Sequence, residues 1–246
     1  MSASGWPMNT SIRAPGFPVD AEQRFKIGPR ARSAYLNVIR AADLLDPAGA
    51  RLARVGITRD ASAGRTATIA FALEYPLRGG RIEERVILSE TADGLQPVEL
   101  ERSVLHSTGR RVRHELVDFT DRTIPLPPST YPEVLLPFLL GWTPFDGKTR
   151  SVFAWITDRF IARVRYRSTG RQTIGLASRK VEAVEVVMFP DFNDWVRLGS
   201  WLSRLVSPFI PKYHMWYRPE PPHALLRFEG SYGPPGAPEI VLELDA

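Results

Sequence analysis

The fold is decided by residues 65–119, which read RTATIAFALEYPLRGGRIEERVILSETADGLQPVELERSVLHSTGRRVRHELVDF. Threonine and alanine alternate there with isoleucine, phenylalanine and leucine between Thr66 and Leu73, as is typical of a strand with one buried face. Short turn signals separate the apolar runs, namely Gly79-Gly80, Asp93-Gly94 and Thr108-Gly109. Because parallel strands need a long crossover connection, these short turns predict an antiparallel meander.

The same pattern extends to both sides of this stretch. It predicts strands at 51–59, 65–75, 80–89, 96–106, 110–119, 151–157, 160–168, 171–176, 179–189, 213–217, 224–229 and 239–244. An antiparallel sheet of this width tends to curl, and the curl buries its concave face. We therefore expect a strongly curved sheet or an incomplete β-barrel.

Helical spacing of apolar residues occurs in three places, 33–45, 131–140 and 192–206. Thr130 and Glu133 have the spacing of a capping box before the second of these. Residues 131–140 are apolar almost all round, which predicts that this helix is buried or closes over something. The expected class is mostly β (α+β), with two or three helices covering the open face of the sheet.

No linker divides the chain into two globular parts. Residues 1–30 are rich in proline and glycine and lack periodicity, which predicts an extended N-terminal arm. We expect residues 31–246 to form a single curved-sheet domain. A chain of 246 residues is within the usual size of one mostly-β domain.

Composition excludes several classes of function. The chain has no cysteine, which excludes disulfide scaffolds, zinc ribbons and thiol nucleophiles. Its net charge of +5 comes from scattered arginines rather than a basic stripe, so we expect no nucleic-acid partner. We see neither a signal peptide nor a membrane-spanning segment and expect a soluble, cytoplasmic protein. Peripheral membrane contact through 192–206 stays open, as does the oligomeric state.

Two histidines share the predicted apolar faces of neighbouring strands. His106 has the parity of Val104, while His114 and Asp118 have the parity of Leu116. If the intervening turn keeps these faces together, the imidazoles lie near each other on the buried side. Such a group could move protons, with His106 or His114 as base and Asp118 as its orienter. The alternative explanation of the same pattern is two buried core histidines whose ring nitrogens have hydrogen-bond partners and no catalytic role.

A third cluster, Tyr213, His214 and Trp216, offers aromatic bodies with polar tips, as suits a ligand wall or ordinary core packing. Alternation sends Tyr213 to one face of its strand and His214 and Trp216 to the other. The candidate ligand-binding residues are Phe71, Leu100, Leu136, Phe138, Trp195, Tyr213, His214 and Trp216.

The order of elements is similar to that of a known family. The echoes are an early helix before the meander, the Asp-Gly turn of Asp93–Pro97, and a tail with Met215-Trp216-Tyr217, Pro222 and Leu225–Gly230. With these features the chain resembles the half-barrel family of the bacterial lipoprotein carriers LolA and LolB, and a related bacterial family of unknown function. The resemblance implies an apolar cavity under a helical lid.

Three functional hypotheses follow from the sequence. The first is binding of a hydrophobic small molecule, lipid or acyl chain in the cavity, without cofactor or metal. The second is a cofactor-free enzyme of lipocalin type (a cyclase, isomerase or hydratase) that uses a cavity histidine. The third is a structural or partner-binding domain whose core is filled.

Overall fold

The computed structural model describes residues 11–13, 21–29, 51–60, 67–77, 80–122, 125–158, 160–176, 179–191, 212–231 and 239–245. Its strands are β1 (Ala21–Pro29), β2 (Arg51–Asp60), β3 (Ala67–Leu77), β4 (Gly80–Thr91), β5 (Gly94–His106), β6 (Arg111–Asp118), β7 (Thr130–Pro132), β8 (Arg150–Thr157), β9 (Phe160–Leu176), β10 (Arg179–Pro190), β11 (Tyr213–Tyr217), β12 (Leu225–Ser231) and β13 (Glu239–Leu244). The described strands form one sheet, so the predicted mostly-β class is confirmed.

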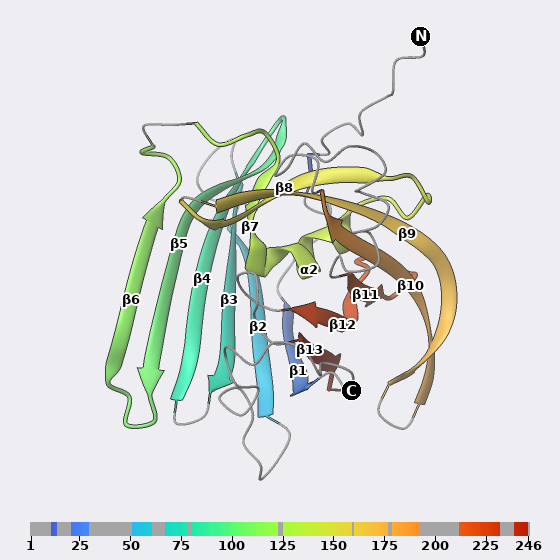
Figure 1. Cartoon of the computed structure of the whole chain (residues 1–246), viewed down its shortest axis with the longest axis horizontal. Coiled ribbons are helices and arrows are strands. Elements are labelled where there is room, and N and C mark those ends of the chain that lie inside the picture. Colours follow the sequence, from blue (N-terminus) through green and yellow to red (C-terminus); the bar gives the residue numbers. More distant parts are fainter. Residues whose placement is uncertain are drawn as a thin grey trace, which may run out of the picture.

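The order of strands in this sheet is β6-β5-β4-β3-β2-β1-β13-β12-β11-β10-β9-β8-β7. Neighbours are antiparallel, except that β7 and β8 are parallel. Two meanders, β1–β6 and β8–β13, are therefore joined where the first strand pairs with the last. Figure 1 shows the resulting curl: β2–β6 form one wall, and β8, β9 and β10 arch over it. The predicted incomplete barrel is confirmed in this form.

Strand β1 lies in the middle of the sheet. Its Phe25 is opposite Ala53 of β2 on one side and Leu244 of β13 on the other. Residues 21–29 thus belong to the sheet, although the sequence assigns them to an arm that precedes the domain. The division of the chain into an arm and one domain otherwise stays a proposal.

The concave face of the first wall is a continuous apolar row. Pairing in register places Ile57, Phe71, Val86, Leu100 and Val117 side by side across β2–β6. All five side chains are buried, and those of the three central residues are fully so. Each strand contributes every second residue to this row, because side chains alternate between the faces of a sheet.

A short helical run fills the space inside the curl. It consists of η1 (Glu133–Leu135), α2 (Leu136–Leu139) and η2 (Leu140–Trp142), and Figure 1 shows α2 between the two walls. Its leucines and Phe138 are buried, as the all-round apolar pattern predicts. Tyr217 Oη donates to Pro137 O at 2.7 Å, which supplies a partner to a carbonyl in a helix too short to pair it. Much of the concave side is thus occupied by the chain's own residues.

The expectation of two or three helices is not met, because α2 is the one α-helix in the described ranges. The predicted helices at 33–45 and 192–206 lie outside the described residues. The capping box is also wrong: Thr130 lies in β7 and its hydroxyl donates to Pro127 O. Pro132 precedes the helical run, and no side chain caps it.

Residues Ser11–Arg13, which we call the clasp, connect β5 with β7 near the two ends of the sheet. Leu95 N, in β5, donates to Ile12 O at 2.8 Å, and Ile12 N donates to Tyr131 Oη, in β7, at 3.0 Å. Ile12 is 1% exposed. The described strands leave the barrel open, and the clasp bridges the opening through these two hydrogen bonds.

Replacing Tyr131 by phenylalanine is expected to lower the free energy of unfolding by about 1–3 kcal/mol, since the buried Ile12 N–H loses its acceptor. Urea denaturation at neutral pH measures this loss. Burial raises the pKa of Tyr131 from 10.0 to about 12. The folded state then holds a proton that the unfolded chain releases, so the stability of the wild type falls as pH rises between these values. The difference in unfolding free energy between wild type and Tyr131→Phe should therefore decrease as pH rises from about 10 to about 12. An increase of this difference over the same range would contradict the burial of Tyr131.

Candidate functional site

A pocket of about 620 Å³ lies beside the clasp, where the two ends of the sheet approach each other. Four segments line this seam pocket: Ser11 of the clasp, Asp93 to Pro97 at the β4–β5 turn, Phe119 to Arg122 after β6, and the loop 125–130. Its volume falls in the range of small-molecule sites, roughly 300–1,000 Å³.

The turn between β4 and β5 forms one wall of the seam pocket. Gly94 has φ +114°, a conformation that L side chains rarely adopt, and a Cβ at this position would lie 2.8 Å from Ile12 O. Thr91 Oγ1 donates to Gly94 O at 2.9 Å and holds the turn. The Asp-Gly signal in the sequence thus fixes both the hairpin and the approach of the clasp.

The end of β6 forms a second wall. Asp118 Oδ1 accepts from Thr120 N and from Thr120 Oγ1, both at 2.7 Å, and these hydrogen bonds lower the pKa of Asp118. They hold the turn that follows β6, while Phe119 N still donates to Val98 O in β5 and the Phe119 ring packs edge-on against Trp155 with centroids 5.1 Å apart. Asp118 therefore shapes the seam pocket through the backbone of the next residues.

The opposite rim is the loop of Pro125, Leu126, Pro127 and Pro128. Proline fixes φ and carries no N–H, so this rim presents rings and few donors. Thr130 Oγ1 donates to Pro127 O at 2.6 Å, and Phe153 N donates to Ser129 O at 2.9 Å. The loop is thus fastened to β8 at its end, and its prolines are available as an apolar wall.

Arg122 is the cation of the seam pocket. Its Nη2 pairs with Asp158 Oδ1, and its guanidinium lies 5.5 Å from the centroid of Phe119 and 6.0 Å from that of Trp155. The side chain of Arg122 is 15% exposed, against 68% for Asp158. Two aromatic rings and one acid thus hold the guanidinium nearly buried.

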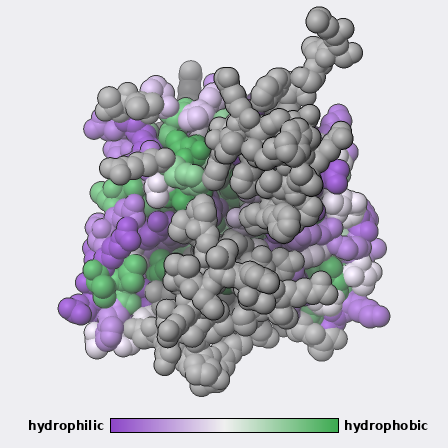
Figure 2. All heavy atoms as spheres, viewed as in Figure 1, coloured by the Kyte–Doolittle hydropathy of each residue, from purple (hydrophilic) through white to green (hydrophobic). Residues whose placement is uncertain are grey.

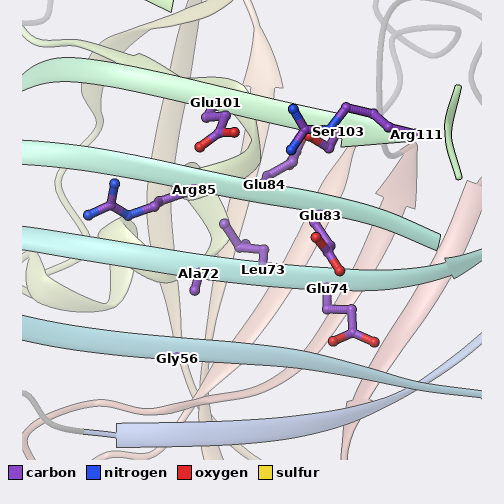
Figure 3. A pocket seen from close by; sticks show the side chains of 10 residues that line it. All are labelled: Gly56, Ala72, Leu73, Glu74, Glu83, Glu84, Arg85, Glu101, Ser103 and Arg111. Atoms are coloured by element: carbon purple, nitrogen blue, oxygen red, sulfur yellow. The ribbon is translucent and has the colours of Figure 1, made fainter. Parts of the chain in front are cut away.

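The second pocket, of about 430 Å³, is a trench on the outer face of β2–β6. Figure 3 shows Glu74 and Glu83 side by side on β3 and β4, while Gly56 and Ala72 leave the strands bare next to them. Arg81 Nε pairs with Glu83 at 2.5 Å and so offsets the repulsion between the two acids. Charged walls and a small floor make this trench a poor site for an apolar ligand.

His106, His114 and Asp118 do not form the predicted buried group. All three are exposed, and each has a separate partner: His106 Nδ1 is 3.1 Å from Thr108 Oγ1, and His114 Nε2 is 3.1 Å from Glu101 Oε1. The prediction that the two histidines lie together on the buried side is therefore wrong. A catalytic role for them stays a prediction, but the buried His-His-Asp cluster on which it was based is not formed.

In edge strand β6 the face that was expected to be buried is the exposed one. Its apolar Val112 and Leu116 are 61% and 59% exposed. In Figure 2, hydrophobic atoms interrupt the hydrophilic surface on the side where Figure 1 places β6. The concave face here carries an ion network instead: Arg102 pairs with Glu84, and its Nη1 lies 3.6 Å from Glu115. Burial raises the pKa of Glu84, and the charge of Arg102 opposes that rise.

The predicted ligand-binding residues separate into three groups. Phe71, Leu100, Leu136 and Phe138 lie together in the packed core, and Phe71 contacts Trp142 with centroids 5.8 Å apart. Trp195 lies outside the described residues. Tyr213, His214 and Trp216 follow the predicted alternation: Tyr213 packs on the core, whereas His214 pairs with Glu185 at 2.7 Å and stacks on Trp216. A ligand role for these residues stays a prediction.

Sequence reasoning did not single out Arg122, Asp158 or the proline loop. The proline run 125–128 by itself predicts no more than a break between strands, and Arg122 is one of many scattered arginines. The signal that was present is the combination of a rigid proline loop with an arginine three residues before its first proline. Only the fold brings Arg122 and the proline loop to the Asp-Gly turn.

No helix in the described ranges combines the length and the apolar character needed to cross a membrane. No family model matches the chain, and no curated protein matches it. Among solved structures, the chain is similar to the crystal structure of a β-barrel-like protein of the domain of unknown function DUF1849 from Brucella abortus, with a TM-score of 0.50 and 10% identity. The likeness covers 92% of this chain and 95% of that one, and at this identity it shows a barrel-like fold.

Proposed function

We propose that the protein binds a hydrophobic small molecule or acyl chain, and that the seam pocket receives it. The observation that carries this proposal is a cavity of about 620 Å³ beside the clasp, lined by residues from both ends of the described sheet. Ligand sites in barrel-like folds are commonly found at such openings. The packed core around Phe71 leaves the concave side less room for a ligand.

The lining supports an apolar ligand. Leu95 and Phe119 are 3% and 8% exposed and form a packed apolar floor, while the exposed Pro125 and Pro128 keep apolar surface that a ligand can cover. Leu126 is half-buried and packs against the main core cluster. Each apolar side chain that a ligand covers contributes by removing surface from water, about 25 cal/mol per Å². Thr120 and Arg122 offer a few polar groups that can orient the ligand.

The resemblance to LolA and LolB agrees with this class of ligand, because those proteins carry lipid-modified cargo. The solved barrel-like protein is of unknown function and supports the fold only. In our proposal the clasp and the proline loop take the place of the helical lid that the resemblance implies. A role in carrying an acyl chain belongs to the same proposal.

A fluorescent, uncharged probe tests the proposal: the methyl ester of a dansyl-labelled undecanoic acid. Wild-type protein should raise and blue-shift its emission as the dansyl group leaves water. Leu126→Trp, which adds volume at the rim of the pocket, should weaken binding about tenfold or more. Ala72→Trp fills the outer trench instead and should bind the ester as the wild type does.

Two results would overturn the proposal. One is an absence of ester binding to folded wild-type protein. The other is loss of binding in Ala72→Trp but not in Leu126→Trp, which would move the site to the outer face. Circular dichroism of each variant before titration shows that the comparison is made between folded proteins.

A further inference from the structure

Arg122 has donors that the described part of the chain does not use. Its Nη1 is buried and has no hydrogen-bond partner among the described residues, while Nη2 pairs with Asp158. A buried donor without an acceptor is costly, and a charged one more so. The side chain lines the seam pocket, and a bound molecule that displaces the exposed Asp158 from the guanidinium can supply the missing acceptor.

The guanidinium is also held in place before any ligand arrives. Phe119 and Trp155 lie within 6.0 Å of it, and those two rings pack edge to face. An arginine fixed in this way loses little side-chain entropy on binding. Its low exposure also means that water competes weakly for its donors.

We propose that Arg122 binds the carboxylate head group of the ligand, so that the protein takes an anionic amphiphile of the fatty-acid type rather than a neutral lipid. This inference rests on the proposed function of the seam pocket. A carboxylate matches the planar fork of a guanidinium and accepts from both of its terminal nitrogens. The apolar tail of the same ligand then lies along Leu95, Phe119 and the proline loop.

Asp158 is the internal competitor for this head group. Its carboxylate already pairs with Nη2, so the guanidinium of Arg122 binds a carboxylate in the structure itself. Being 68% exposed, Asp158 is well hydrated whether or not it is paired, so releasing it costs little. The ligand carboxylate takes over Nη2 from Asp158 and supplies Nη1 with its acceptor.

The test compares two probes that differ only in charge, the dansyl-labelled undecanoic acid and its methyl ester. Wild-type protein should bind the acid about tenfold more tightly than the ester, as a charged hydrogen bond requires. Arg122→Gln should bring this ratio close to one. Asp158→Asn removes the competitor and should raise the ratio, with no change in affinity for the ester.

Arg171→Gln is the matched control, because Arg171 forms an exposed surface pair with Glu182 at 3.9 Å, outside the seam pocket. It should leave the ratio unchanged. Equal binding of acid and ester to the wild type would overturn the role of Arg122 and leave the proposed function standing. Failure of both probes to bind would overturn the proposed function itself. A fall of the ratio in Asp158→Asn would contradict the competition, even if Arg122→Gln does not fold.

Discussion

Replacement of Phe71 by alanine is expected to lower the free energy of unfolding by about 4 kcal/mol. Phe71 is fully buried in the middle of β3, with Ile57 and Val86 as its neighbours in register and Trp142 against its ring. Its truncation leaves a cavity between the sheet and the helical run, and this cavity adds to the lost burial. Urea denaturation of wild type and variant measures the difference.

Leu116→Ala is the matched control on the outer face, where Leu116 is 59% exposed, and it should change stability by no more than about 0.5 kcal/mol. The Phe71 result also separates two descriptions of the concave side. If Phe71 lined an open cavity, its truncation would cost little stability and would instead change the affinity for an apolar probe. A small loss of stability in Phe71→Ala would therefore contradict the packed interior.

The second large effect is expected at Gly94, where alanine should cost about 3 kcal/mol. A positive φ of +114° strains any L side chain by roughly 1–3 kcal/mol, and the added Cβ would also lie 2.8 Å from Ile12 O. Relief of that contact displaces the clasp and weakens the hydrogen bond from Leu95 N to Ile12 O. The same variant should bind the ester probe less tightly, because the clasp lines the seam pocket.

Gly109→Ala separates the two causes. Gly109 also has a positive φ, +81°, but nothing lies within 4 Å of a Cβ built there. We expect this variant to lose about 1 kcal/mol and to keep full affinity for the probe. Equal losses in the two variants would mean that backbone strain alone accounts for the effect and that the clasp plays no part.

Most strands of the fold could be predicted from the sequence, because each carries a local signal. The runs between 51 and 119 alternate clearly and end at glycine turns, and the structure places β2–β6 there with small shifts of boundary. The predicted strands 160–168 and 171–176 are one strand, β9, since Gly170 bends the backbone without ending the ladder. Pairing of β1 with β13 has no local signal, because it joins segments from opposite ends of the chain.

The candidate site could be predicted only in part, for two physical reasons. Alternation shows that two faces differ but not which one is buried, and in β6 the inner face carries Glu115 in an ion network with Arg102. His114 was therefore assigned to the wrong face. The seam pocket depends on the pairing of Arg122 with Asp158 and on the approach of Gly94 to Ile12, and each joins residues far apart in the sequence. Local patterns do not contain such contacts.

The central claim, that the ligand binds in the seam pocket, is tested most directly by locating the bound ligand. Backbone hydrogen–deuterium exchange, measured with and without the dansyl ester, locates it. Binding in the seam pocket predicts slower exchange in residues 93–97 and 119–130, with little change in residues 72–74, 83–85 and 101–103 of the outer trench. Protection confined to the trench, or confined to the concave strands around Phe71, would contradict the assignment of the site.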